Sequence, residues 1–140
     1  MIQAHSISWT KADAAARVRT YQRLFAASIV TNVIVSLFAI LGPVTMARLL
    51  GQPDPFPEAW VRIWGATLLG LHVVYLPGLR NPTFYRWPNW ASIGIKFWMT
   101  TIFLLQGADY ILFALWDASW GVVLLIAYYR LAQADMAWRP

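Results

Sequence analysis

The apolar positions of the chain fall into four long segments separated by short polar or proline-rich breaks. The segments cover residues 24–41, 58–76, 89–105 and 110–130. Each is close to the length of about 20 residues that a helix needs to cross a bilayer. The breaks contain Gly, Pro, Asn or Asp, which interrupt helices. The pattern predicts an all-α fold, an integral membrane four-helix bundle that occupies residues 1–140 as a single transmembrane domain.

Two shorter helices are expected outside these segments. Thr10 is followed three residues later by Asp13, a capping pattern that predicts a short helix near Lys11, with a solvated lead-in as the alternative. Residues 44–50 are expected to form a short interfacial helix before a proline-rich extended link. The segment 24–41 is longer than the apolar core of a signal peptide, so we expect an uncleaved anchor.

The last two apolar segments meet at the polar break 106–109, which contains Gly107. We expect a hairpin turn here. An unbroken helix through both segments would be about 60 Å long, which is twice the thickness of the hydrocarbon core. The alternative of three spans is therefore disfavoured.

Composition agrees with a membrane protein: 59% of residues are hydrophobic and 12% are charged, whereas about 25% are charged in soluble domains. The isoelectric point near 10.0 raises the question of nucleic acid binding. We expect none, because the basic residues lie at the ends of apolar segments and not in base-reading motifs. The absence of cysteine excludes disulfides, thiolate metal sites and dithiol redox chemistry.

The flanking charges predict the orientation of the chain. Basic residues exceed acidic ones in the N-terminal segment, in the loop 79–88 and from Arg130 onward, but not in the other two loops. Because cytoplasmic loops carry an excess of Lys and Arg, both termini are expected in the cytoplasm (N-in/C-in). The predicted location is the bacterial inner (cytoplasmic) membrane, with several passes through the lipid bilayer.

Two opposite charges interrupt the last two apolar segments, Lys96 in one and Asp117 in the other. They lie at nearly equal distances along the chain from Gly107, so a hairpin would place them at nearly the same depth. A lone charge in hydrocarbon costs about 2.5–3.5 kcal/mol, and such charges therefore usually pair. We expect Lys96 and Asp117 to be partners.

The same depth argument extends to two further polar residues. His72 and Lys96 are equally far from the middle of the loop between their segments, and Asn32 falls near the same level. A polar layer of Asn32, His72, Lys96 and Asp117 is therefore predicted. It either fixes which helices meet, or lines a pocket for a lipid-soluble ligand or a proton path, or faces other subunits.

No catalytic residue, metal ligand or cofactor site is predicted. The two histidines, His5 and His72, have no paired metal-ligand spacing on a predicted helix, and no nucleotide-binding or nucleophile motif occurs. The tryptophans are expected to be interface anchors or lipid-facing bulk.

Several short motifs resemble those of a known group of proteins. They are GLHVVYL at 70–76, RNP at 80–82, GIK at 94–96 and WDASW at 116–120. Over roughly residues 60–130 this pattern resembles small four-helix bacterial membrane proteins that are DoxX-like in size and layout. The resemblance implies a four-helix bundle with Lys96 and Asp117 as shared features, and it implies no activity. Better-studied DoxX relatives are linked to quinone-coupled sulfur redox systems.

Two functions follow as expectations. The first is an accessory or scaffolding subunit of a larger membrane complex or homo-oligomer, which is not an enzyme. The alternative is a binder of a quinone or lipid, and possible enzyme or transporter, with a pocket lined by His72, Lys96 and Asp117. A packed interior favours the first function and a hollow interior favours the second.

Overall fold

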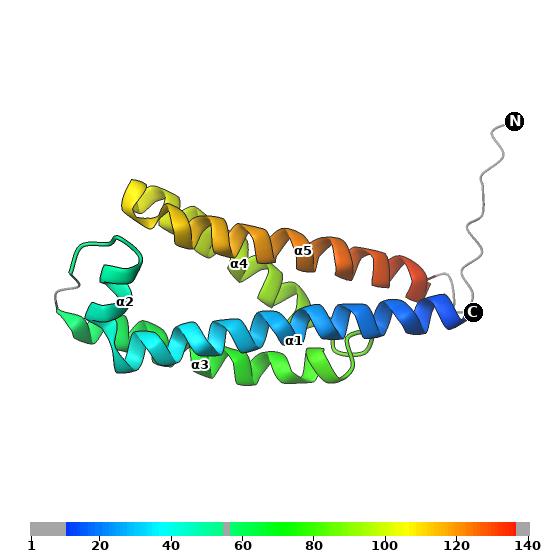
Figure 1. Cartoon of the computed structure of the whole chain (residues 1–140). Coiled ribbons are helices and arrows are strands. Elements are labelled where there is room, and N and C mark those ends of the chain that lie inside the picture. The colour runs from blue at the N-terminus through cyan, green and yellow to red at the C-terminus, as the bar shows by residue number, and fades with distance from the viewer. Residues whose placement is uncertain (1–10, 55–56, 137–140) are drawn as a thin grey trace, which may run out of the picture.

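The structure is a computed structural model that describes residues 11–54 and 57–136 (Figure 1). Thr10 of the predicted capping pattern and His5 lie outside these residues. Over the described residues the chain is all-helical and contains no strand. The elements in order are α1 (Lys11–Leu41), α2 (Pro43–Leu49), α3 (Glu58–Arg80), α4 (Arg86–Gln106), the 3₁₀ turn η1 (Ala108–Tyr110) and α5 (Ile111–Met136).

The four long helices form two antiparallel pairs, α1 with α3 and α4 with α5. The pairs are joined by contacts of α1 with α5 and of α3 with α4. Figure 1 shows that the pairs lie close together at the end where the described chain begins and ends. They diverge toward the opposite end, where α2 and the α4–α5 turn lie.

The turn between α4 and α5 lies where the sequence predicts it. Gly107 ends α4 with φ of 109°, a conformation that side-chain-bearing residues rarely adopt. A glycine therefore permits the reversal that makes α4 and α5 neighbours.

Two predicted helix boundaries are wrong. The predicted lead-in helix and the segment 24–41 form one continuous helix, α1, because no Gly or Pro occurs between Lys11 and Leu41. The segment 58–76 continues through Pro77 to Arg80. Gln22 of α1 helps to hold this extension, because its side-chain amide donates to the carbonyl oxygens of Leu79 (3.0 Å) and Arg80 (3.1 Å).

The first loop is anchored by charged side chains. Arg62 donates to the Ile40 carbonyl and to Glu58 (3.0 Å), so its guanidinium is bound by protein groups rather than only extending toward headgroups. Arg48 at the end of α2 binds Asp54 at 3.3 Å, and this hydrogen bond raises the pKa of the Arg48 guanidinium. At the divergent end, Arg62 thus joins α3 to α1, and Arg48 joins α2 to the loop that follows it.

The main apolar core lies toward the end where the two helix pairs are close together. Its buried members come from all four long helices and are Tyr21, Phe25, Tyr75, Ile93, Leu124, Tyr128 and Leu131. A buried hydrogen bond accompanies it: the Tyr21 hydroxyl donates to Asn89 Oδ1 at 2.8 Å. The Asn89 amide nitrogen donates in turn to the Tyr85 carbonyl at 2.7 Å. The start of α4 is thereby fixed against α1.

Three helical segments are long and apolar enough to cross a membrane: Lys11–Leu41, Glu58–Arg80 and Ala108–Met136. Only 28%, 17% and 22% of their most apolar stretches are buried inside the protein, so most of their apolar surface faces outward. Helix α4, which carries Arg86, Asn89 and Lys96, does not belong to this set. The composition thus assigns three candidate spans where four were predicted.

Two glycines on α3 provide a matched test of the α1–α3 packing. A Cβ on Gly65 would lie 2.8 Å from the Ser36 carbonyl oxygen, whereas a Cβ on Gly70 would meet nothing within 4 Å. We expect Gly65→Ala to lower the free energy of unfolding by about 1–3 kcal/mol, because backbone must move. Gly70→Ala should raise it by up to about 1 kcal/mol through helix propensity.

The measurement is reversible unfolding of the purified protein in mild detergent. Equal effects of the two substitutions would contradict the close α1–α3 approach at Gly65.

Candidate functional site

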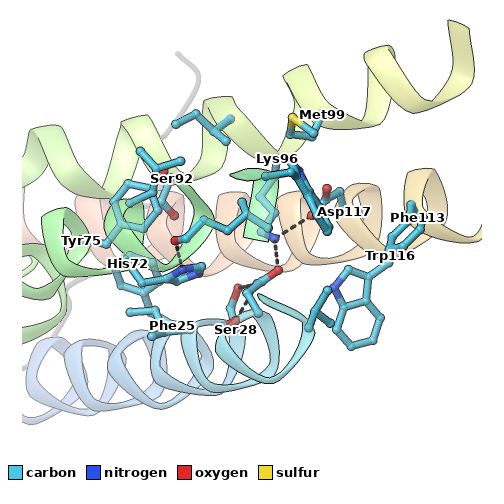
Figure 2. A pocket seen from close by; sticks show the side chains of 17 residues that line it. Phe25, Ser28, His72, Tyr75, Ser92, Lys96, Met99, Phe113, Trp116 and Asp117 are labelled. Carbon is cyan, nitrogen blue, oxygen red and sulfur yellow. Dashed lines mark hydrogen bonds and ion pairs between the residues drawn. The ribbon is translucent and has the colours of Figure 1, made fainter. Parts of the chain in front are cut away.

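The centre of the molecule contains the ion pair predicted from the sequence. Lys96 Nζ lies 2.6 Å from Asp117 Oδ1, and each side chain is 13% exposed (Figure 2). Lys96 projects from the middle of α4 and Asp117 from the first half of α5, so the hairpin turn at Gly107 places them opposite each other. The contact neutralises both charges within apolar surroundings.

Asn32 of α1 accepts a second hydrogen bond from the ammonium group. Lys96 Nζ donates to Asn32 Oδ1 at 3.1 Å, and Asn32 Nδ2 donates to the Ser28 carbonyl at 2.6 Å. The amide therefore has a fixed orientation, with its oxygen toward the cation and its nitrogen toward its own helix. Ser28, Asn32 and Ser36 are all buried, since their spacing of four residues places them on one face of α1. Three helices thus meet at Lys96.

His72 lies beside this centre but does not belong to its hydrogen-bond network. The His72 Nδ1 atom bonds to the Leu68 carbonyl of its own helix, and the ring packs edge-on against Tyr75 at 5.9 Å. No hydrogen bond joins it to Lys96 or Asp117 among the contacts of the described residues. His72 therefore lies near Lys96 and Asp117, as the depth argument predicted. Its Nδ1 atom bonds within α3 and does not reach α4.

A small cavity adjoins these side chains. Its volume is about 40 Å³, and residues from α1, α3, α4 and α5 line it (Figure 2). A few water molecules fit in such a space, whereas pockets for organic ligands usually measure about 300–1,000 Å³. Besides Asn32, His72, Lys96 and Asp117, its walls include Phe25, Ser28, Tyr75, Ser92, Met99 and Trp116. The centre of the bundle is therefore packed rather than hollow.

A larger groove opens at the divergent end of the molecule. Its volume is about 710 Å³, and it shares Trp64, Met99 and Phe113 with the central cavity. Aromatic rings contact one another along it: Trp64 and Phe113 have centroids 5.9 Å apart, and Phe103 and Phe113 lie 5.2 Å apart. The groove is mostly apolar and exposed, and Trp64, Met99 and Phe113 line both it and the central cavity.

Sequence reasoning did not identify Asn89 or the aromatic groove. Asn89 entered the sequence analysis only as the first residue of the segment 89–105, yet it is fully buried. The only signal in the sequence was a polar residue at the start of an apolar segment, and it was not used. Trp64 and Phe113 carried no comparable signal, because contacts between distant aromatic residues leave no spacing pattern in the chain.

The chemistry of the centre is limited by its own bonding. The Lys96 ammonium donates to two acceptors and the Asp117 carboxylate accepts from that cation, so each charge is bound by a protein group. Among the residues that the structure describes, no group of three or more His, Cys, Asp or Glu side chains forms a candidate metal site. The arrangement is suited to joining helices.

Comparison with known proteins gives no further assignment. No family model matches the chain, and no curated protein and no solved structure matches it either. The DoxX-like resemblance stays a prediction that rests on the short motifs alone.

The ion pair can be tested by comparing single and double substitutions. We expect Lys96→Met alone to lower the free energy of unfolding by about 3–5 kcal/mol, because it leaves a buried carboxylate without its partner. The double variant Lys96→Met, Asp117→Leu should recover most of that loss, since apolar replacement of a whole buried pair is often neutral. Unfolding in mild detergent provides the measurement.

The pair Arg62–Glu58 is the control, because both side chains are 46% exposed. Breaking an exposed pair should cost at most about 1 kcal/mol. A loss of that small size for Lys96→Met would show that the central pair does not hold the helices together.

Proposed function

We propose that the protein is a multi-pass membrane protein in which α1, α3, α4 and α5 cross the bilayer, with both termini on the cytoplasmic side of a bacterial inner membrane. The outward apolar surface of three helices supports this arrangement. Helix α4 joins them because the charge of Lys96 is compensated inside the protein, by Asp117 and Asn32. Arg86 at its start binds Asp135 of α5 at 2.9 Å, at the end expected to face the cytoplasm.

Within the membrane, the proposed role is that of an accessory or scaffolding subunit of a larger complex or homo-oligomer. One observation carries this proposal: the polar centre is closed, with its charges bonded to each other and a cavity of only about 40 Å³. The interior therefore holds the helices together, and in this proposal partners bind to the outer faces of the helices.

The outer face of α3 supports a helical partner. Ala66 and Gly70 are exposed on this face, one helical turn apart, and the space beyond Gly70 is open. Small residues at this spacing allow the backbone of another membrane helix to approach closely.

A second candidate function is the binding of a hydrophobic small molecule such as a quinone or lipid. It is favoured by the open groove, whose volume of about 710 Å³ falls within the range of ligand sites. Its place differs from the pocket expected at His72, Lys96 and Asp117, since Trp64, Met99 and Phe113 form the wall between the two.

The proposed orientation predicts the labelling of single cysteines, which are easily interpreted because the chain contains none. In intact spheroplasts, a membrane-impermeant maleimide should label Asp109→Cys. Phe84→Cys should react only after the membrane is permeabilised, and Val122→Cys, on the apolar face of α5, should react poorly throughout. Labelling of Phe84→Cys in intact spheroplasts would contradict the N-in/C-in arrangement.

The proposed role predicts that the protein, extracted from its own membrane in mild detergent, has a mass above that of the 15.9 kDa chain. The double variant Ala66→Leu, Gly70→Leu should dissociate, because the added side chains prevent close approach. Ala27→Leu on the exposed face of α1 is the control and should leave the assembly intact. Native mass spectrometry measures the mass.

A monodisperse monomer from wild-type membranes would contradict the accessory role.

Organic extraction of the same preparation tests the second candidate: a hydrophobic molecule retained by the wild type and lost from Trp64→Ala supports the groove as its site. Its absence from the wild-type extract would count against ligand binding.

A further inference from the structure

A second groove lies between α1 and α5. Its volume is about 510 Å³. Helix α1 contributes residues from its first half and α5 from its second half: Asp13, Ala16, Arg17, Thr20, Leu24, Val123, Ile126, Ala127 and Arg130. None of these residues lines the central cavity or the aromatic groove.

The lining of this groove changes from charged to apolar along its length. Because α1 and α5 run in opposite directions, Arg17 and Arg130 lie at the same end, and Leu24 and Val123 lie toward the other. Val123 and Ile126 are 39% and 49% exposed, so the apolar part is open on the surface. The groove is thus charged at one end and apolar at the other, as a lipid molecule is.

The predicted spans 24–41 and 110–130 place this change at the membrane boundary. Leu24 begins the first span and Arg130 ends the last, so Arg130 is at headgroup level, Arg17 lies beyond it, and Val123 and Ile126 are in hydrocarbon. The helical rise of 1.5 Å per residue makes the distance from Arg130 to Val123 about 10 Å. That length accommodates the upper part of an acyl chain below a headgroup.

From this arrangement we infer that the groove binds one anionic glycerophospholipid of the cytoplasmic leaflet, with its phosphate between Arg17 and Arg130 and an acyl chain along Leu24, Val123 and Ile126. The described lining contains two arginines and one carboxylate, that of Asp13, so its formal charge is +1, which favours an anionic over a zwitterionic headgroup. Basic residues near a membrane surface each contribute to the attraction of anionic lipids. The inference rests on the proposed membrane insertion.

The test uses the full chain in mild detergent and native mass spectrometry with two lipids of equal acyl length, phosphatidylglycerol and phosphatidylcholine. The wild type should retain one phosphatidylglycerol in preference to phosphatidylcholine. Arg130→Gln should weaken retention of phosphatidylglycerol about fivefold, as expected for the loss of one cation near the headgroup. Ala127→Trp, which fills the apolar part without changing charge, should weaken retention of both lipids.

Arg23→Gln is the matched control, because Arg23 is an exposed residue of α1 that does not line the groove. It should leave lipid retention unchanged. Inorganic phosphate added in excess should not displace the lipid, since it lacks the acyl chain. The unfolding midpoint of each variant distinguishes lost binding from lost folding.

Equal retention of the two lipids, displacement by phosphate alone, or equal weakening by Arg23→Gln and Arg130→Gln would overturn the inference. These outcomes are separable from failure of the proposed function. If cysteine labelling supports the four spans while lipid selectivity is absent, the groove assignment alone is wrong. If labelling contradicts the spans, the membrane proposal fails first.

Discussion

The contact between Lys96 and Asp117 is the interaction on which the arrangement of the helices depends. Each residue is a charge in an otherwise apolar segment, and either one alone in hydrocarbon would cost about 2.5–3.5 kcal/mol. At 2.6 Å they neutralise each other, and the amide of Asn32 accepts a further hydrogen bond from the same ammonium. The pair therefore fixes how α5 faces α4, and Asn32 fixes how both face α1.

This central contact separates two ends with different properties. Toward the chain termini, the Tyr21–Asn89 hydrogen bond and the aromatic core hold the two helix pairs together. Toward α2 the pairs diverge, and an aromatic groove opens between them. Because the centre is closed, the proposed contacts with partners and lipids fall on the outer surfaces: the face of α3 around Gly70, the aromatic groove, and the α1–α5 groove.

The sequence predicted the features that follow from local rules. The turn at Gly107, the all-helical class of the chain and the contact between Lys96 and Asp117 all follow from composition and spacing. The sequence did not predict how α3 passes through Pro77, because Gln22 and the packing of Gly78 against Asn89 support that extension from distant parts of the chain. Nor did spacing determine the rotamer of His72 or the burial of Asn89, which depend on tertiary contacts.

The central claim is that Lys96 and Asp117 are in direct contact when the protein is in a lipid bilayer. Solid-state NMR of the protein in bilayers, with ¹⁵N-labelled lysine and ¹³C-labelled aspartate, measures the dipolar coupling between Lys96 Nζ and Asp117 Cγ. The four long helices contain two lysines, Lys11 and Lys96, so only two lysine signals have to be assigned. A strong coupling is expected from the 2.6 Å contact between Nζ and Oδ1. The absence of a measurable coupling between these two groups in folded protein would contradict the account.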